Sequence, residues 1–132
     1  MDNSELLKLT LADLTAKIKA REVSPVEVIE AALSQADRLQ PRLNSFITMF
    51  HERARSQAQE QEAALMRGEY LGPLQGIPMG IKDNITMAGI RATVGSKVLA
   101  DNIAEEDAEV VAKCQNAGAI ILGKENLEEF AA

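Results

Sequence analysis

The sequence is poor in aromatic residues, with no tryptophan, one tyrosine and three phenylalanines in 132 residues. Apolar residues still make up 46% of the chain, so aliphatic side chains must supply most of a buried core. Cysteine is also scarce: Cys114 stands alone and cannot form an internal disulfide. A chain without disulfides fits a reducing compartment, and we expect a cytoplasmic location.

Long apolar runs and an excess of basic residues are missing as well. Nowhere does the chain hold the roughly 18 or more consecutive apolar residues of a membrane-spanning helix, and residues 1–10 lack the pattern of a signal peptide. Twenty acidic residues against fourteen basic ones give a formal charge of −6, which repels phosphates and anionic lipids. We therefore expect neither a membrane segment nor direct nucleic-acid binding.

The first part of the chain carries helical patterns. Apolar residues at helical spacing predict an amphipathic helix over residues 10–21. Ser24-Pro25-Val26-Glu27 combines an N-cap, a proline at the first helical position and the glutamate of a capping box. The second helix should therefore begin there, and it should end near Leu39, because Pro41 disfavours its continuation.

Residues 46–50 have the composition of a short strand or extended link, and a Gln-, Glu- and Ala-rich run predicts a helix over residues 52–67. Residues 1–70 are thus expected to form a helical layer.

After Gly72 the chain predicts strands. Residues 77–82 alternate as a strand does, 107–117 predict a helix capped by Asp107, and the apolar run 119–122 predicts a buried strand. A strand, a crossover helix and a second strand form a βαβ unit with parallel strands. A last helix is expected around residues 125–129. Residues 71–132 are thus expected to begin an α/β core, one incomplete domain together with the helical layer.

Lys82 is the candidate catalytic residue. Alternation places it on the same strand face as Gly80, which leaves room beside the lysine stem, and at the strand end where α/β sheets open their ligand crevices. An ammonium group screened from water by apolar neighbours gives up its proton more readily, so Lys82 could serve as a general base. From spacing alone, a surface lysine that serves only solubility is the commoner interpretation.

Other candidates favour structural interpretations. Glycine spacing around Lys82 does not match a phosphate-binding loop. His51 has no second ligand and is interpreted as a surface histidine, Cys114 as a small buried hydrophobe, and Ser96 as a turn residue. No metal site and no cofactor are expected. The chain has six serines, none in the context of a nucleophile: Ser4, Ser24, Ser34, Ser45, Ser56 and Ser96.

Three blocks of sequence resemble the amidase-signature family. Residues 72–84, GPLQGIPMGIKDN, resemble that family's lysine motif, and 89–96, GIRATVGS, resemble the segment that follows it. Residues 107–131, which include GAIILGKENLEEFA, are similar to the stretch leading into the family's signature. The similarity extends to the N-terminal helices and covers nearly the whole chain.

The resemblance implies an α/β fold with a mixed sheet covered on both faces by helices. It also implies that Lys82 deprotonates a bridging serine held by a cis peptide, which activates a second, nucleophilic serine for attack on a carboxamide. In family members both serines lie beyond the position of Ala132. We therefore expect this chain to supply the lysine of an amidase that acts on a small-molecule amide, and to be inactive alone.

Two alternatives remain open from the sequence. One is the A subunit of glutamyl-tRNA(Gln) amidotransferase, a family member that releases ammonia from glutamine for partner subunits. Ala92-Thr93 stands where many relatives have Thr-Thr, and Glu125-Asn126-Leu127 stands where the amidotransferase subunit usually has Thr-Asn-Met. These differences favour a free-standing amidase, with a homo-oligomer as a possible assembly. The other is a non-catalytic folding fragment or interaction module.

Overall fold

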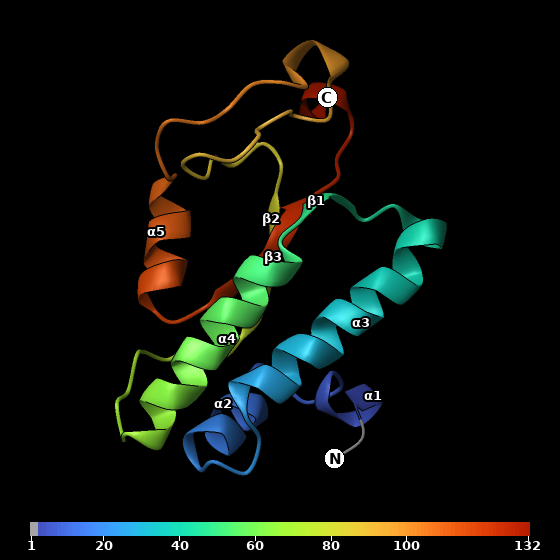
Figure 1. The fold of residues 1–132 in the computed structure, drawn as a ribbon. Helices are drawn as coiled ribbons and strands as arrows, with labels where there is room; N and C mark the ends of the chain where they lie inside the picture. Colours follow the sequence, from blue (N-terminus) through green and yellow to red (C-terminus); the bar gives the residue numbers. More distant parts are fainter. Residues whose placement is uncertain (1–2) are drawn as a thin grey trace.

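The computed structural model describes residues 3–132, in which a three-stranded sheet lies between two groups of helices (Figure 1). The elements follow in the order α1 (Asn3–Leu6), α2 (Leu11–Lys19), α3 (Pro25–Leu43), β1 (Phe46–Met49), α4 (His51–Met66), β2 (Pro78–Lys82), η1 (Lys97–Leu99), α5 (Glu109–Asn116), β3 (Ile120–Glu125) and η2 (Glu129–Ala131), where η marks a 3₁₀ helix. No helix of this described part is both long and apolar enough to cross a membrane.

The predicted starts of the first two long helices are confirmed. The Thr10 side chain accepts a hydrogen bond from the Asp13 backbone N–H at 3.1 Å and caps α2. At the start of α3, Ser24 Oγ accepts from the Glu27 N–H, and Glu27 Oε2 accepts from the Ser24 N–H at 2.8 Å. This reciprocal capping box satisfies two backbone donors that the first helical turn leaves free.

The predicted end of the second helix near Leu39 is wrong, because α3 continues to Leu43 with Pro41 inside it. Proline lacks one backbone N–H, so only a single helical hydrogen bond is missing so close to the end. Asn44 takes a left-handed conformation and its N–H donates to the Gln40 carbonyl at 2.8 Å. This local cap stabilises the last turn despite the proline.

The sheet has the strand order β1-β3-β2, with β1 antiparallel and β2 parallel to the central β3. The parallel pair is joined through α5, which confirms the predicted βαβ unit. The register between β2 and β3 shifts after Met79, so that Gly80 lies opposite Gly123 and Lys82 opposite Glu125. Such an irregularity changes which side chains face each side of the sheet beyond it.

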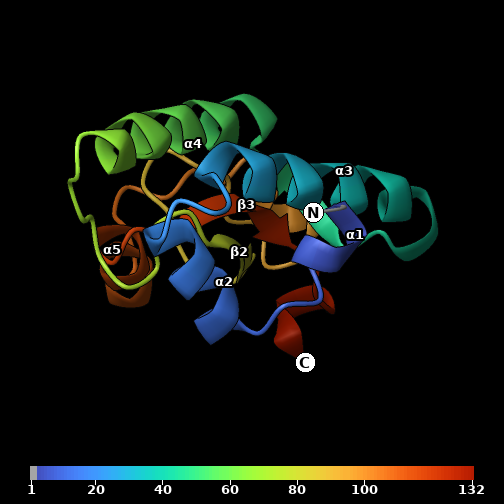
Figure 2. The ribbon, with the colours of Figure 1, turned by 90° about the horizontal axis from the view of Figure 1, so that it is seen from below.

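Helices cover both faces of this mixed sheet, as predicted. Figure 2 shows α3 and α4 forming one layer over the sheet, with α5 on the other side. Two apolar clusters fill these interfaces. The cluster under α3 and α4 consists of Ile29, Ala32, Leu33, Ala54, Ala58, Ile120 and Leu122. The cluster on the α5 side consists of Phe50, Ile81, Met87, Val111 and Ile121.

Two expectations for the C-terminal part are wrong. Asp107 does not cap α5, whose N-cap is Ala108, because the Asp107 carboxylate accepts a hydrogen bond from the Ala88 N–H at 2.8 Å instead. No α-helix begins around residues 125–129: β3 runs on to Glu125, and only the 3₁₀ helix η2 follows. The strand is longer than its apolar run because Lys124 and Glu125 still pair with both β1 and β2.

Candidate functional site

Lys82 lies at the C-terminal end of β2, the position expected for a ligand-facing residue of a parallel strand. Its side chain is exposed, whereas the preceding Ile81 is buried among the apolar residues on the α5 side. No carboxylate in residues 3–132 lies within 4.0 Å of the Lys82 ammonium. Because the Lys82 side chain is exposed, the expected screen of apolar neighbours around it is not present in the described structure.

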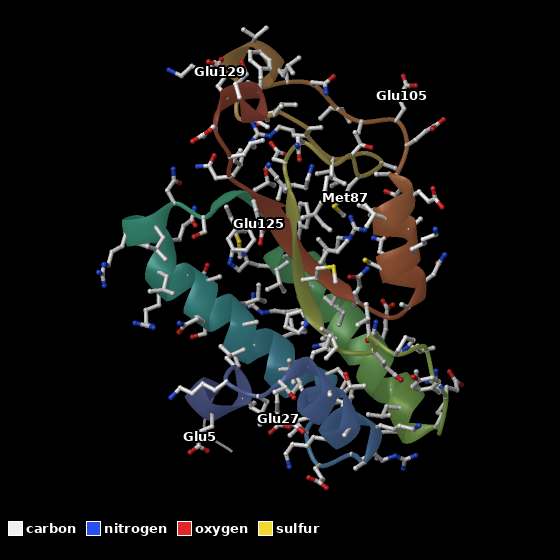
Figure 3. All side chains as sticks on the ribbon, turned by 180° about the vertical axis from the view of Figure 1, so that it is seen from behind. Glu5, Glu27, Met87, Glu105, Glu125 and Glu129 are labelled. Atoms are coloured by element: carbon white, nitrogen blue, oxygen red, sulfur yellow. The ribbon has the colours of Figure 1, made fainter. Side chains whose placement is uncertain are left out.

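The space beside Gly80 is occupied by a different side chain from the one expected. A methyl group at position 80 would overlap the carboxylate of Glu125, rather than the Lys82 stem. Figure 3 shows Glu125 at the end of β3, beside β2. A side chain at position 80 would therefore displace the flexible Glu125 carboxylate, which lies across from β2.

A buried ion pair anchors the residue next to Lys82. The Asp83 and Lys124 side chains are both 0% exposed, and Lys124 Nζ lies 2.9 Å from Asp83 Oδ1. Lys124 Nζ also donates to the Arg91 carbonyl at 3.4 Å. Oδ1 receives no well-directed hydrogen bond, so its contact with Lys124 is chiefly electrostatic. Two opposite charges buried together offset part of the large penalty that each would suffer alone.

The second carboxylate oxygen of Asp83 holds the loop that follows β2. Oδ2 accepts hydrogen bonds from the Thr93 backbone N–H at 3.0 Å and from the Thr93 hydroxyl. The Asp83 backbone adds two more links, since its N–H donates to the Glu125 carbonyl at 2.9 Å and its carbonyl accepts from Val94 at 3.1 Å. Asp83 therefore joins β2, β3 and the 91–96 loop directly beside the candidate base.

Ser96 lies on this same loop but its hydroxyl is occupied. It donates to Glu129 Oε1 at 2.7 Å and accepts from the Val98 N–H, which starts η1. The Phe130 N–H donates to the Val94 carbonyl at 2.9 Å, so the C-terminal residues dock on the loop. These bonds give Ser96 a structural role and leave it without a link to Lys82.

The remaining candidates lie elsewhere. His51 at the start of α4 pairs with Asp37 of α3 at 2.8 Å, and Cys114 is half-buried on α5. No group of three or more His, Cys, Asp or Glu side chains in the described residues is placed to hold a metal ion. A cavity of about 440 Å³ lies between the α2–α3 turn and α4, lined by residues such as Ser24 and Glu62, and does not include Lys82.

Three residues around Lys82 gain a role only from the structure: Asp83, Lys124 and Glu125. The sequence held one signal for Lys124, which directly follows the apolar run of residues 120–123. A lysine buried at the end of such a strand needs a partner for its charge. The partner of that charge is 41 positions away, and local patterns do not connect the two.

Comparisons with known proteins place this geometry in a family. Residues 27–132 match the family model described as Amidase. The chain is 43% identical over 127 residues to the A subunit of glutamyl-tRNA(Gln) amidotransferase from Carboxydothermus hydrogenoformans, and the match spans 96% of this chain and 26% of that protein. The chain thus corresponds to about a quarter of the length of its curated relatives.

Solved structures agree. The native peptide amidase from Stenotrophomonas maltophilia superposes with a TM-score of 0.85 at 34% identity, over 93% of this chain and 26% of the other. Fatty acid amide hydrolase gives a TM-score of 0.91 at 24% identity, over 96% of this chain and 22% of the other, a likeness of fold. With a family model over most of its length, the same α/β architecture and the lysine motif at the end of β2, the chain belongs to the amidase-signature family.

Proposed function

We propose that this chain supplies the general base, Lys82, of a longer amidase that cleaves carboxamides with a serine, a bridging cis-serine and this lysine. The observation that carries the proposal is the position of Lys82. It ends a parallel strand and is exposed. The next residue, Asp83, is fixed in place because one carboxylate oxygen pairs with Lys124 and the other accepts a hydrogen bond from Thr93. The serines would come from the remainder of the longer protein.

The chemistry follows from the weak nucleophilicity of a serine hydroxyl. A neutral lysine amine accepts the proton of the bridging serine, which in turn takes the proton of the nucleophilic serine as that serine attacks the amide carbonyl. The amine or ammonia leaves with a proton returned along the same path, and an acyl-enzyme remains. Water then attacks the acyl group and regenerates the serine.

The structure distinguishes Lys82 from the other lysine at this end of the sheet. Lys124 has no exposed surface and its ammonium is paired with Asp83, so it cannot meet a serine or a substrate without breaking a buried ion pair. Lys82 has neither restriction. The two neighbouring lysines thus suit opposite roles, with Lys124 structural and Lys82 free to exchange a proton.

Substitution of Lys82 in the full-length protein tests the proposal. Lys82→Ala should lower kcat by about 10²- to 10⁴-fold, the usual contribution of a positioned acid-base group, while circular dichroism stays unchanged. Lys82→Arg should fail as well, because guanidinium does not release its proton in proteins. Lys97→Ala, at another exposed lysine, is the matched control and should keep full activity. Activity of Lys82→Ala within about tenfold of the unsubstituted enzyme would contradict the assignment.

A second candidate function is the A subunit of an amidotransferase, which would release ammonia from glutamine in a complex with partner subunits. The 43% identity to the A subunit of a glutamyl-tRNA(Gln) amidotransferase favours it. The two functions are separated by assaying ammonia release from glutamine and from simple carboxamides, with and without the partner subunits of a related amidotransferase. Glutamine turnover that requires the partners would support the amidotransferase, and carboxamide turnover without them would support the free amidase.

The 132-residue chain alone should hydrolyse no amide, because it offers a base with no activated serine. The third alternative, a folding fragment or interaction module, is tested on this isolated chain by light scattering and hydrogen exchange. Ammonia release by the purified chain that follows the protein through a second column would show that the nucleophile has been misplaced.

A further inference from the structure

The loop of residues 93–96 is bound on one side to Asp83, the residue next to Lys82. The Val94 N–H donates to the Asp83 carbonyl at 3.1 Å, and the Thr93 N–H and hydroxyl both donate to Asp83 Oδ2. The Asp83 side chain is fully buried. Because Asp83 directly follows Lys82, these bonds fix the loop to the strand end that carries the proposed base.

On its other side the same loop is bound to residues 127–130, the segment that follows β3. The Val94 carbonyl accepts a hydrogen bond from the Phe130 N–H at 2.9 Å. A Cβ built on Gly95 would lie 2.8 Å from the Leu127 carbonyl oxygen, so the backbones of the loop and the segment are in direct contact. The loop therefore joins this segment to the end of β2.

The backbone of Val94 indicates how firmly the loop is held. Its φ is +52°, in the left-handed region where a β-branched residue is an outlier. Such a conformation persists only where the surrounding contacts hold it, and strained residues of this kind cluster at functional sites. Both backbone groups of Val94 are engaged, the N–H by Asp83 and the carbonyl by Phe130. The strained residue is thus the one that connects the two sides of the loop.

Glu129 supplies the side-chain contact between the segment and the loop. Its Oε1 accepts a hydrogen bond from the hydroxyl of Ser96 at 2.7 Å, and Ser96 is buried. Figure 3 shows Glu129 at the end of the molecule where these loops gather. A hydrogen bond to a carboxylate is stronger than one between neutral groups. Because Glu129 itself is exposed, its substitution removes this bond without opening a cavity in the core.

We propose that Glu129 is a positioning residue: through Ser96 and the loop it fixes the segment that leads toward the serines at a set place relative to Lys82. The inference rests on the proposed function, in which Lys82 is the base and the serines belong to the remainder of the longer protein. The family resemblance places both serines after this segment along the chain. Proton transfer requires the base within hydrogen-bond reach of the hydroxyl, and a displacement of about 1 Å can lower the rate about 10²-fold.

Kinetics of the full-length enzyme test this role. Glu129→Ala removes the bond to Ser96 and should lower kcat about tenfold with KM within about twofold, because proton transfer is misaligned while substrate binding is not. Glu129→Gln still offers a side-chain oxygen to the Ser96 hydroxyl and should restore most of kcat. An unchanged kcat in Glu129→Ala, or a Glu129→Gln variant as slow as Glu129→Ala, overturns the proposal.

Two controls separate positioning from a general loss of stability. Glu128→Ala removes the neighbouring exposed carboxylate and should leave kcat unchanged. Ser24→Ala removes a hydrogen bond of a serine hydroxyl in the helical layer, and should lower the thermal midpoint of unfolding without lowering kcat. If Ser24→Ala lowers kcat as much as Glu129→Ala does, the effect of Glu129 is one of stability alone and the positioning role is wrong.

Hydrogen exchange of the full-length protein gives a measurement that does not depend on activity. Loss of the Ser96 contact should speed exchange of the Phe130 N–H in Glu129→Ala, whereas Glu128→Ala should leave it unchanged. Ser96→Ala should have the same effect as Glu129→Ala, and the two substitutions together should add little, because they remove one shared contact. Exchange at the unsubstituted rate in Glu129→Ala would show that this side chain does not hold the segment, which also overturns the proposal.

The two proposals fail differently. Activity retained in Lys82→Ala removes Lys82 as the base, whereas the exchange rates still show whether Glu129 fixes the segment on the loop. Activity lost in Lys82→Ala, with kcat unchanged in Glu129→Ala, overturns only the role of Glu129.

Discussion

The helices of residues 3–70 and the segment 72–132, which carries β2, β3 and the loops around Lys82, are stabilised in different ways. Ion pairs of the helical layer lie on its surface, such as Lys17–Glu22 and Arg55–Glu30, and its caps join residues three apart. In the second region the Asp83–Lys124 pair is fully buried, and Gly118 packs directly against the backbone of Gln75.

This difference predicts which substitutions lower the free energy of unfolding most. Exposed ion pairs contribute little, because water and salt screen both charges and the long side chains lose freedom when they pair. A buried pair responds much more strongly to the loss of one member, since the remaining charge stays in an apolar setting. We therefore expect the stability of the fold to be most sensitive around the site and least sensitive on the helical surface.

The largest effect on stability is expected from Lys124→Met. The substitution leaves the Asp83 carboxylate buried without its cation, which should lower the free energy of unfolding by about 3–5 kcal/mol. Lys113→Met, at an exposed lysine of α5, is the matched control and should change it by less than about 0.5 kcal/mol. Denaturant unfolding of both variants measures the difference. Equal stability of the two would mean that the buried pair contributes nothing to the fold.

A smaller loss is expected from Gly118→Ala. Gly118 has a φ of +99°, and a Cβ there would lie 2.7 Å from Gln75 Cα and 2.8 Å from its N, backbone atoms that cannot move aside cheaply. We expect a loss of about 3 kcal/mol. Gly89→Ala separates strain from overlap, because Gly89 has a φ of +75° with nothing within 4 Å of its Cβ, and should lose about 1–2 kcal/mol. A Gly118→Ala loss no larger than that of Gly89→Ala would count against the overlap.

The same division explains which features were predictable from sequence. Ser24 and Glu27 predicted the start of α3 because a capping box is formed by residues three apart. The apolar run before Lys124 predicted a buried strand, and its pairing with β2 followed from the βαβ rule. The position of Lys82 at a strand end was likewise predicted.

Apart from the end of α3, which a local cap at Asn44 extends, the failed predictions depended on contacts distant in sequence. The extension of β3 through Glu125 follows from the pairing of Lys124 and Glu125 with β1 and β2, and no local propensity reports that pairing. Asp107 was assigned to the α5 cap because capping is a local preference, but its carboxylate binds the Ala88 N–H, 19 residues away. The packing of the Glu125 carboxylate over Gly80 likewise depends on the register between β2 and β3.

In the helical layer, Ser24→Ala should have a moderate effect. Its hydroxyl caps the Glu27 N–H, and loss of such a cap lowers stability by about 1 kcal/mol. Ser34→Ala is a suitable control, because Ser34 is exposed within the same helix and alanine is a better helix former, so stability should stay equal or rise slightly. Thermal unfolding of the two variants makes the comparison. A Ser24→Ala variant as stable as Ser34→Ala would show that other contacts fix the start of α3.

The smallest effect is expected at the end of α4, where Arg67 Nε and Nη2 donate to the two carboxylate oxygens of Glu69 at 2.8 and 3.0 Å. These hydrogen bonds, more than the charge attraction, hold the pKa of Glu69 below its usual value. A carboxyl whose pKa is lower in the folded state adds stability above its unfolded pKa of about 4.3, and this stability is lost as the pH falls through the folded pKa.

Both side chains of this pair are more than half exposed, at 59% and 51%, so solvent screening should keep the change in global stability below detection. The titration of Glu69 itself is the sensitive measurement. Its NMR midpoint should rise in Arg67→Gln, and should rise toward the same value in the unsubstituted protein at about 1 M salt, where the Debye length is only about 3 Å. A Glu69 midpoint that stays the same in Arg67→Gln and at high salt would mean that the pair does not form in solution. The comparison of weak surface pairs with strong buried ones would then depend on the Asp83–Lys124 pair alone.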